Sequence, residues 1–171
     1  MKGYIQVYTG NGKGKTTAAL GLAVRALGAG KKVFIGQFAK SKHYSELETI
    51  NTLLKNITIK QYGMGCFIFE KPAEEDIQAA QAGLIELTRI IESDEYDVII
   101  LDEANIAVYY NLITVKELIA AITKRNERTE IIITGRYATP EIMDFADLVT
   151  EMKEVKHYYQ QGVQARVGIE K

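Results

Sequence analysis

A glycine- and lysine-rich segment holds the residues best suited to chemistry in this sequence. It runs Gly10-Asn11-Gly12-Lys13-Gly14-Lys15-Thr16-Thr17 and directly follows an apolar run. Glycines let a backbone turn tightly and point successive amide groups into one concavity, where an anion accepts several hydrogen bonds. In such a phosphate-binding loop, Lys15 would reach the outer phosphates and the Thr16 hydroxyl would bind Mg²⁺. We therefore predict that this segment binds the triphosphate of a nucleotide.

The glycine spacing of this P-loop departs from the usual pattern. Four residues normally separate the first glycine from the Gly-Lys pair. Here three residues separate Gly10 from Gly14, and Thr9 occupies the usual place of the first glycine. We expect a tighter loop or one that is shifted relative to the phosphates. A dinucleotide-binding fingerprint is the rival interpretation, but its glycine spacing does not match and it gives Lys15 no role.

Two neighbouring carboxylates end a second apolar run. Residues 98–101 are branched and apolar, and Asp102 and Glu103 follow them, which is the pattern of a Walker B strand. A strand end beside the P-loop strand would bring these carboxylates near a metal ion, and hard divalent cations prefer oxygen ligands. One would bind Mg²⁺ directly and the other through water, and Glu103 would also suit the orientation of attacking water. A solvated acid pair with a structural role is the alternative.

Arg136 ends another apolar run, after Thr134 and Gly135. An arginine at the end of a strand can stabilise the negative charge on a departing phosphate. It is equally often the partner in a surface ion pair, and both interpretations stay open.

The elements that must position these residues alternate along the chain. Four short, branched, apolar runs are typical of strands covered on both faces, as in a parallel sheet: 4–8, 32–38, 97–102 and 130–135. Strands that alternate with helices predict an α/β fold, here a single domain over 1–171 with a mostly parallel sheet and helices on both faces. Ligands in such folds lie beyond the carboxyl ends of the strands.

Helical periodicity occupies the segments between these runs. One helix is expected over 16–27, with Leu20, Ala23, Val24 and Leu27 on one face. Another follows Pro72 to about residue 92, with Ile77, Ala80, Leu84, Leu87 and Ile91 at steps of three and four. Capping boxes are expected at 45–48 and 114–117, and Thr139 before Pro140 is an expected N-cap.

The composition excludes several classes of protein. The 171 residues are 47% hydrophobic and 25% charged, and the net charge is −1, without the basic excess of a sequence-independent nucleic-acid binder. Cys66 is the only cysteine, so no intrachain disulfide can form. No apolar run approaches the roughly 20 residues that span a bilayer. We expect a cytoplasmic protein that binds neither nucleic acid nor membrane.

The motifs together resemble one enzyme family across nearly the whole chain. The resemblance covers YIQVYTGNGKGKTTAALGLAVRALGAGKKVFIGQF, YDVIILDEANIA, IIITGR, ADLVTEMKEVKH and the closing GIE. These segments are similar to the P-loop type of ATP:cob(I)alamin adenosyltransferases, which make adenosylcobalamin. The resemblance implies a RecA-like fold, a homodimer and MgATP bound in an unusual orientation. It also implies that reduced cobalt attacks the ribose C5′ and expels inorganic triphosphate.

Carried over by position, the resemblance assigns residues to this reaction. Residues 11–17 would hold the triphosphate, and Thr16 and Glu103 would bind Mg²⁺ with Asp102 close by. In the family, a Phe and a Trp two residues apart pack on the corrin and displace its lower axial ligand. Phe67 and Phe69 match those positions, with Phe in place of Trp. A flavoprotein reductase is an expected source of electrons.

Two other functions fit the P-loop without the resemblance. A RecA-like ATPase or kinase would use Glu103 to activate water or an acceptor hydroxyl and would release ADP. A non-catalytic nucleotide sensor would bind ATP and form no product. The nature of the phosphate product distinguishes all three functions.

Overall fold

A computed structural model describes residues 2–39, 44–63 and 72–170, and six segments of this part form one β-sheet. In chain order the strands are β1 (Ile5–Thr9), β2 (Val33–Gln37), β3 (Ile57–Gln61), β4 (Val98–Asp102), β5 (Glu130–Thr134) and β6 (Leu148–Glu151). They lie in the order β3-β2-β4-β5-β1-β6, and all neighbours are parallel. The predicted α/β fold, of the kind found in P-loop NTPases, is therefore confirmed.

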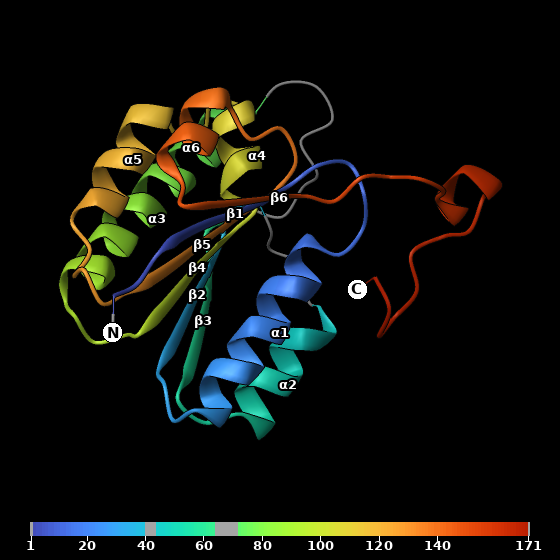
Figure 1. The fold of residues 1–171 in the computed structure, drawn as a ribbon. Helices are drawn as coiled ribbons and strands as arrows, with labels where there is room; N and C mark the ends of the chain where they lie inside the picture. The colour runs from blue at the N-terminus through green and yellow to red at the C-terminus, as the bar shows by residue number, and fades with distance from the viewer. Residues whose placement is uncertain (1, 40–43, 64–71, 171) are drawn as a thin grey trace.

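Helices cover both faces of this sheet (Figure 1). They are α1 (Lys15–Gly28), α2 (Ser45–Leu53), α3 (Glu74–Glu92), α4 (Ala104–Tyr109), α5 (Val115–Thr123) and α6 (Pro140–Phe145). The first two lie on one face and the other four on the opposite face (Figure 1). The hydrophobic core accordingly has two parts, one under each layer of helices. The carboxyl ends of all strands meet at one edge of the sheet, because the strands are parallel.

The four predicted strands are present, and the structure adds one strand at each edge of the sheet. In β3 half-buried and exposed residues alternate, and all of β6 is exposed. The predicted strands were recognisable because their apolar runs are covered on both faces. The two edge strands lack such runs, since solvent reaches one side of each, and the sequence analysis missed them for that reason.

The Walker B strand does not lie beside the P-loop strand. β4 pairs with β2 and β5, and β5 lies between β4 and β1. The expected adjacency is therefore wrong, because a third buried apolar strand occupies the centre of the sheet. Side chains at the strand ends must bridge β5 if Asp102 is to reach the P-loop.

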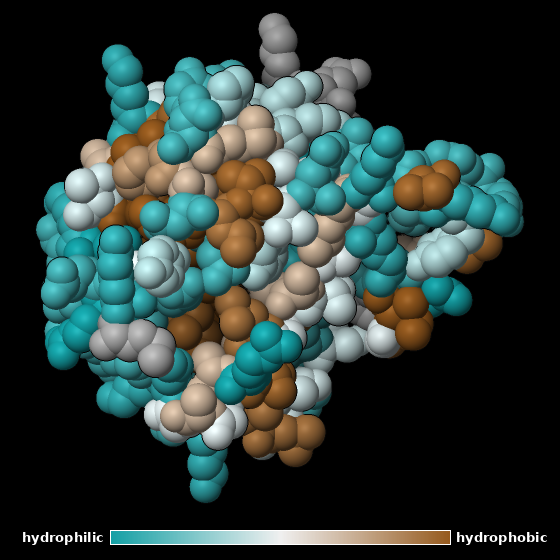
Figure 2. All heavy atoms as spheres, in the orientation of Figure 1, coloured by the Kyte–Doolittle hydropathy of each residue, from teal (hydrophilic) through white to brown (hydrophobic). Residues whose placement is uncertain are grey.

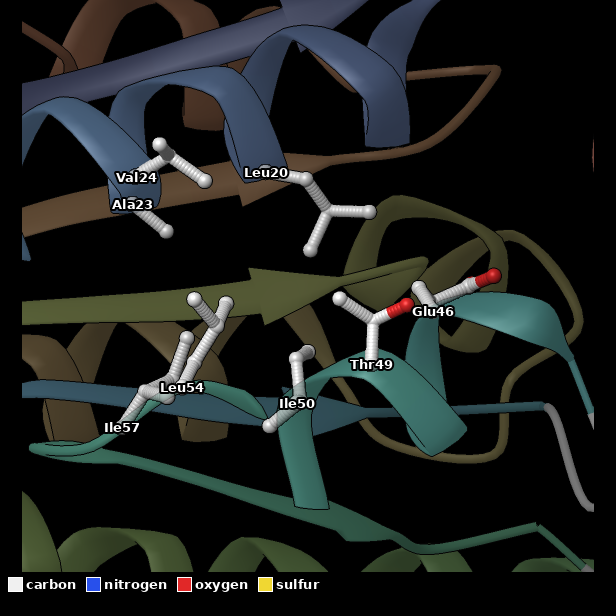
Figure 3. Close-up of a pocket in the computed structure, with 8 residues that line it drawn as sticks. All are labelled: Leu20, Ala23, Val24, Glu46, Thr49, Ile50, Leu54 and Ile57. Carbon is white, nitrogen blue, oxygen red and sulfur yellow. The ribbon is translucent and has the colours of Figure 1, made fainter. Parts of the chain in front are cut away.

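The predicted face of the helix after the P-loop is correct only in part, since Ala23 is buried and Leu20 and Leu27 are half-buried against the core. Ala19, Ala23 and Ala26 are buried in α1, whereas Val24 is 56% exposed. Small side chains let the helix lie close to the sheet and leave the larger ones on its flank. There, an apolar hollow of about 180 Å³ opens between α1 and α2 (Figure 3). The predicted face of α3 is correct, with all but Ile77 fully buried.

Two of the three predicted helix starts are confirmed. The Thr114 hydroxyl accepts a hydrogen bond from the Glu117 N–H, and the Glu117 carboxylate accepts one from the Thr114 N–H. Thr139 accepts a bond from the Ile142 N–H, with Pro140 as the first helical residue. The capping box at 45–48 is wrong, because α2 begins at Ser45 itself and Tyr44 is the N-cap residue.

The chain after β6 leaves the body of the molecule (Figure 1). This segment, residues 152–170, is called the C-terminal arm below. It contains one turn of 3₁₀ helix, Tyr158–Gln161, and returns so that Glu170 lies near Lys13. Polar and apolar side chains are mixed over its surface (Figure 2), and Val155 and Val167 are 89% and 78% exposed.

Helices that could cross a lipid bilayer are absent from the described part of the chain, where none is both long enough and apolar enough.

We predict that Gly83→Ala destabilises the fold by about 1–3 kcal/mol through overpacking. A Cβ on Gly83 would lie 2.5 Å from Tyr62 Cγ, so α3 or the tyrosine ring would have to move. Gly21→Ala in α1 is the matched control, because a Cβ there meets no atom within 4 Å. It should stabilise the fold by about 0.5–1 kcal/mol, as alanine favours a helix over glycine. Urea unfolding measures both, and equal effects would contradict the contact between α3 and Tyr62.

Candidate functional site

The loop between β1 and α1 is held by the start of the C-terminal arm. Gly10 and Gly14 have φ of +92° and +120°, which residues with a side chain rarely adopt. The Gly12 N–H donates a 2.6 Å hydrogen bond to the Met152 carbonyl, and a Cβ on Gly12 would also lie 2.6 Å from that oxygen. The glycines are therefore needed for the turn and for the close approach of the arm.

Lys15 is a buried cation inside the curve of this loop. Its side chain is enclosed, and Nζ donates hydrogen bonds of 2.8 Å to the carbonyls of Gly10 and Gly12. Burial lowers the pKa of the Lys15 ammonium group. Of the charges nearby, Glu103 and Asp102 oppose this pKa shift and Arg136 adds to it. The site thus places the ammonium group where phosphate oxygens could take over from the two carbonyls.

Asp102 connects three strand ends to the P-loop. Its carboxylate is 1% exposed. Oδ1 accepts hydrogen bonds from the Thr16 hydroxyl at 2.8 Å and the Thr134 hydroxyl at 2.7 Å, and Oδ2 accepts one from Gln37 Nε2 at 3.1 Å. The carboxylate therefore connects the ends of β2 and β5 with the first turn of α1. It faces the P-loop and is not a solvated surface acid.

Glu103 follows Asp102 in a strained backbone conformation. Its φ of +59° is left-handed, and its N–H donates a 3.0 Å hydrogen bond to the Thr134 hydroxyl. A side chain in this region raises the backbone energy, and such residues gather at functional sites. The half-buried carboxylate is close enough to influence the pKa of Lys15. Both acids thus lie at the edge of the sheet that carries the P-loop.

Arg136 lies in the turn after β5, at the same edge. Its side chain is exposed, and within the described ranges it forms no ion pair. Its charge nevertheless lowers the pKa of Lys15. The interpretation of Arg136 as a surface ion-pair partner therefore has no support among the described residues. The arginine adds positive charge beside the P-loop.

Three of the predicted phosphate-binding residues, Asn11, Lys13 and Thr17, are exposed. Lys13 Nζ donates a 3.0 Å hydrogen bond to the Ile169 carbonyl and lies 3.9 Å from the Glu170 carboxylate. Hydrogen bonds from Arg166 and Tyr158 lower the pKa of Glu170 to about 2. In this structure Lys13 therefore holds the end of the C-terminal arm.

Three polar residues of the site were not predicted: Gln37, Thr134 and Asn105. Gln37 and Thr134 end buried strands, and Asn105 is buried at the start of α4. A polar residue that ends an apolar strand was the signal that could have revealed the first two. The two predicted corrinoid-contacting residues, Phe67 and Phe69, lie outside the described residues.

Comparison with known proteins identifies the family of this chain. The profile of the family described as ATP:corrinoid adenosyltransferase BtuR/CobO/CobP matches residues 1–170. The chain belongs to this family. Its members are transferases, and the predicted resemblance is confirmed.

Several named members of this adenosyltransferase family align with almost the whole chain. A corrinoid adenosyltransferase of Escherichia coli K12 is 35% identical over 169 residues, which are 99% of this chain and 86% of the relative. The corrinoid adenosyltransferase CobA of Salmonella typhimurium is 36% identical with the same coverage. One from Pseudomonas aeruginosa is 32% identical over 170 residues, which are 99% of this chain and 84% of the relative.

We predict that Thr134→Val destabilises this adenosyltransferase by about 2 kcal/mol, because it takes hydrogen bonds away from buried polar groups. The variant removes a donor to Asp102 and the acceptor of the Glu103 N–H. Thr129→Val is the control, since Thr129 is equally buried but donates only a 3.5 Å bond to the Tyr96 carbonyl. Thermal and urea unfolding should show the larger loss for Thr134→Val. A larger loss for Thr129→Val would refute the role assigned to Thr134.

Proposed function

We propose that the chain transfers the 5′-deoxyadenosyl group of ATP to the cobalt of a reduced corrinoid, cob(I)alamin. The electron pair of cob(I) attacks the ribose C5′, so that a cobalt–carbon bond forms while the C5′–oxygen bond breaks. Inorganic triphosphate leaves with the electrons of the broken bond. The cobalt is formally oxidised by two electrons, and adenosylcobalamin is the product, for its biosynthesis or salvage.

One observation carries the proposal. In a chain of this family, Thr16 of the P-loop donates its hydroxyl proton to Asp102 at the end of β4. This bond joins the phosphate-binding loop to the acidic strand, and it places Lys15 and Glu103 at one edge of the sheet. A triphosphate bound there would meet cations on one side and a metal-binding hydroxyl on the other.

The protein's task in this reaction is electrostatic. Cob(I) is already a strong nucleophile, so no side chain must supply one or act as a general base. The enzyme must instead hold C5′ in line with the cobalt and stabilise the negative charge that leaves with the triphosphate. We assign that stabilisation to Lys15, the amides of residues 13–17 and Arg136. The Coulomb attraction between a desolvated ammonium group such as Lys15 and a phosphate oxygen is stronger than the same attraction in water.

We also propose a magnesium ion at this site. The Thr16 hydroxyl donates a hydrogen bond to Asp102, and hydroxyl and carboxylate oxygens are ligands that suit Mg²⁺. We propose Thr16 and Glu103 as ligands, with Asp102 orienting Thr16 and available to the ion through water. When bound, Mg²⁺ would neutralise part of the charge on the triphosphate.

We further propose partners that the family resemblance supports. Phe67 and Phe69 would pack on the corrin and displace its lower axial ligand, which makes cob(II) easier to reduce. A flavoprotein reductase would supply the electron. The working form would be a homodimer in the cytoplasm.

The first test is an anaerobic incubation of the purified protein with MgATP and chemically reduced cob(I)alamin. We expect the visible spectrum of light-sensitive adenosylcobalamin and one triphosphate for each turnover. An unchanged corrin spectrum with release of ADP and phosphate would instead identify a RecA-like ATPase or kinase. Saturable ATP binding without any product would identify a nucleotide sensor.

We predict that Lys15→Ala lowers kcat at least about 100-fold, the usual loss when a group that stabilises transition-state charge is removed. Lys31→Ala serves as the control, because Lys31 is a partly exposed lysine that lies 4.0 Å from Asp97 and follows α1 at its far end. Its activity should remain unchanged. Near-normal turnover by Lys15→Ala would refute the phosphate assignment.

We predict that Phe69→Ala mainly impairs the use of cob(II)alamin through a reductase. The aromatic wedge would favour the state without a lower ligand, and pre-reduced cob(I)alamin does not need that help. The measurement compares rates from the two starting corrinoids in the same preparation. Equal losses from both would contradict the wedge.

A further inference from the structure

Asn105 is a buried amide at the start of α4, next to the acidic end of β4. Its side chain is 0% exposed. Nδ2 donates a 3.1 Å hydrogen bond to the carbonyl of Gly135. Oδ1 is buried and has no hydrogen-bond partner in the part of the chain that the structure describes. The contact with Gly135 is therefore the one hydrogen bond of this side chain there.

Gly135 begins the turn that carries Arg136. The turn contains two positive φ angles, +126° at Gly135, which glycine adopts readily, and +63° at Tyr137, which is uncommon for a residue with a side chain. On one side it is tied to β1, because the Gly135 N–H donates to the Tyr8 carbonyl and the Ala138 N–H donates to the Thr9 hydroxyl, both at 3.2 Å. Arg136 lies between these two anchors.

Helix α4 holds the same turn from the other side. Asn105, near its first residue, binds the Gly135 carbonyl, and Tyr109, its last residue, stacks on Tyr137 with ring centroids 4.2 Å apart. The packing at Gly135 is tight, since a Cβ there would lie 3.0 Å from Asn105 Cβ. The backbone on both sides of Arg136 is thus held by contacts with β1 and α4.

The amide has two opposing effects on stability at this position. Its Oδ1 has no partner among the described residues, which disfavours the folded state, whereas its Nδ2 satisfies the Gly135 carbonyl, which an apolar side chain would leave without this donor. The specific contribution of the amide is its hydrogen bond to the Gly135 carbonyl in the turn. Asn105 also stands two residues after Glu103, so it links the acidic strand end to the arginine.

We propose that Asn105 is a positioning residue that aims Arg136 at the charge on the departing triphosphate. The inference rests on the proposed function, because it acts through the role of Arg136 in that reaction. Asn105 itself touches no substrate. Its removal should lower kcat and leave the KM for ATP nearly unchanged, since Arg136 acts on charge that develops in the transition state.

The test is a double-mutant cycle of Asn105→Leu and Arg136→Ala, assayed with cob(I)alamin and MgATP. Asn105→Leu should lower kcat about tenfold in the wild-type background and less than about twofold in the Arg136→Ala background, because residues that act together are not additive. Ile122→Val, a core substitution remote from the turn and buried in α5, is the control for general destabilisation. Its effect should be the same in both backgrounds.

A second cycle approaches the contact from its other side. Gly135→Ala keeps Asn105 but pushes the turn away from it, and it should show the same loss of effect in the Arg136→Ala background. This cycle decides the question where Asn105→Leu fails to fold.

The outcomes separate the two proposals. If Asn105→Leu lowers kcat by the same factor in the wild-type and Arg136→Ala backgrounds, the positioning role is overturned, whereas the proposed transferase activity is not affected. No effect of Arg136→Ala would overturn both roles assigned to the turn. A wild-type protein that makes no adenosylcobalamin would overturn the proposed function and with it this inference.

Discussion

The buried carboxylate of Asp102 is the interaction on which the rest of the site depends. Isolated, such a charge would be very costly inside the protein, so it must receive hydrogen bonds from every side. Its donors are Thr16, Thr134 and Gln37, which come from α1, β5 and β2. The Gln37 amide oxygen in turn accepts from Gln61 on β3. Satisfying one acid therefore aligns the strand ends and fixes the first turn of the helix that carries the P-loop.

The backbone around this acid is held in conformations that free chains avoid. Glu103 and Tyr137 have positive φ, and both follow the buried ends of central strands. Each is stabilised by a contact with a neighbouring element: the Thr134 hydroxyl accepts from the Glu103 N–H, and Tyr109 stacks on Tyr137. Strain of this kind persists only where surrounding structure enforces it. The buried strands thus supply the rigidity that holds Glu103 and Arg136 at the same edge of the sheet, where both influence the pKa of Lys15.

Features that depend on residues close together in the sequence could be predicted, whereas features that depend on contacts between distant residues could not. The central strands, the P-loop and the caps of α5 and α6 were predictable because each depends on residues within a few positions. The order of the strands was not, since pairing of β5 between β1 and β4 is decided by contacts far apart in the chain. The same holds for Lys13, which the motif assigns to phosphate and which here contacts Ile169, 156 positions away. Asn105 could not be recognised from the sequence, because the contact that distinguishes it is with Gly135, which follows β5.

The cations of the site gain by binding an anion. Burial already lowers the pKa of Lys15, and the charge of Arg136 lowers it further, so the two cations repel each other when no anion lies between them. A triphosphate would reverse both effects by screening the repulsion and by replacing the carbonyls that now accept from Lys15. Lys15 would then hold its proton more firmly, because phosphate oxygens favour the charged form of the ammonium group. Because the leaving triphosphate bears more negative charge than the same group within ATP, cations placed beside it would stabilise the charge that develops as the C5′–oxygen bond breaks. Because the corrinoid substrate itself supplies the nucleophile, the enzyme needs cations beside the leaving group and contacts that hold those cations in place.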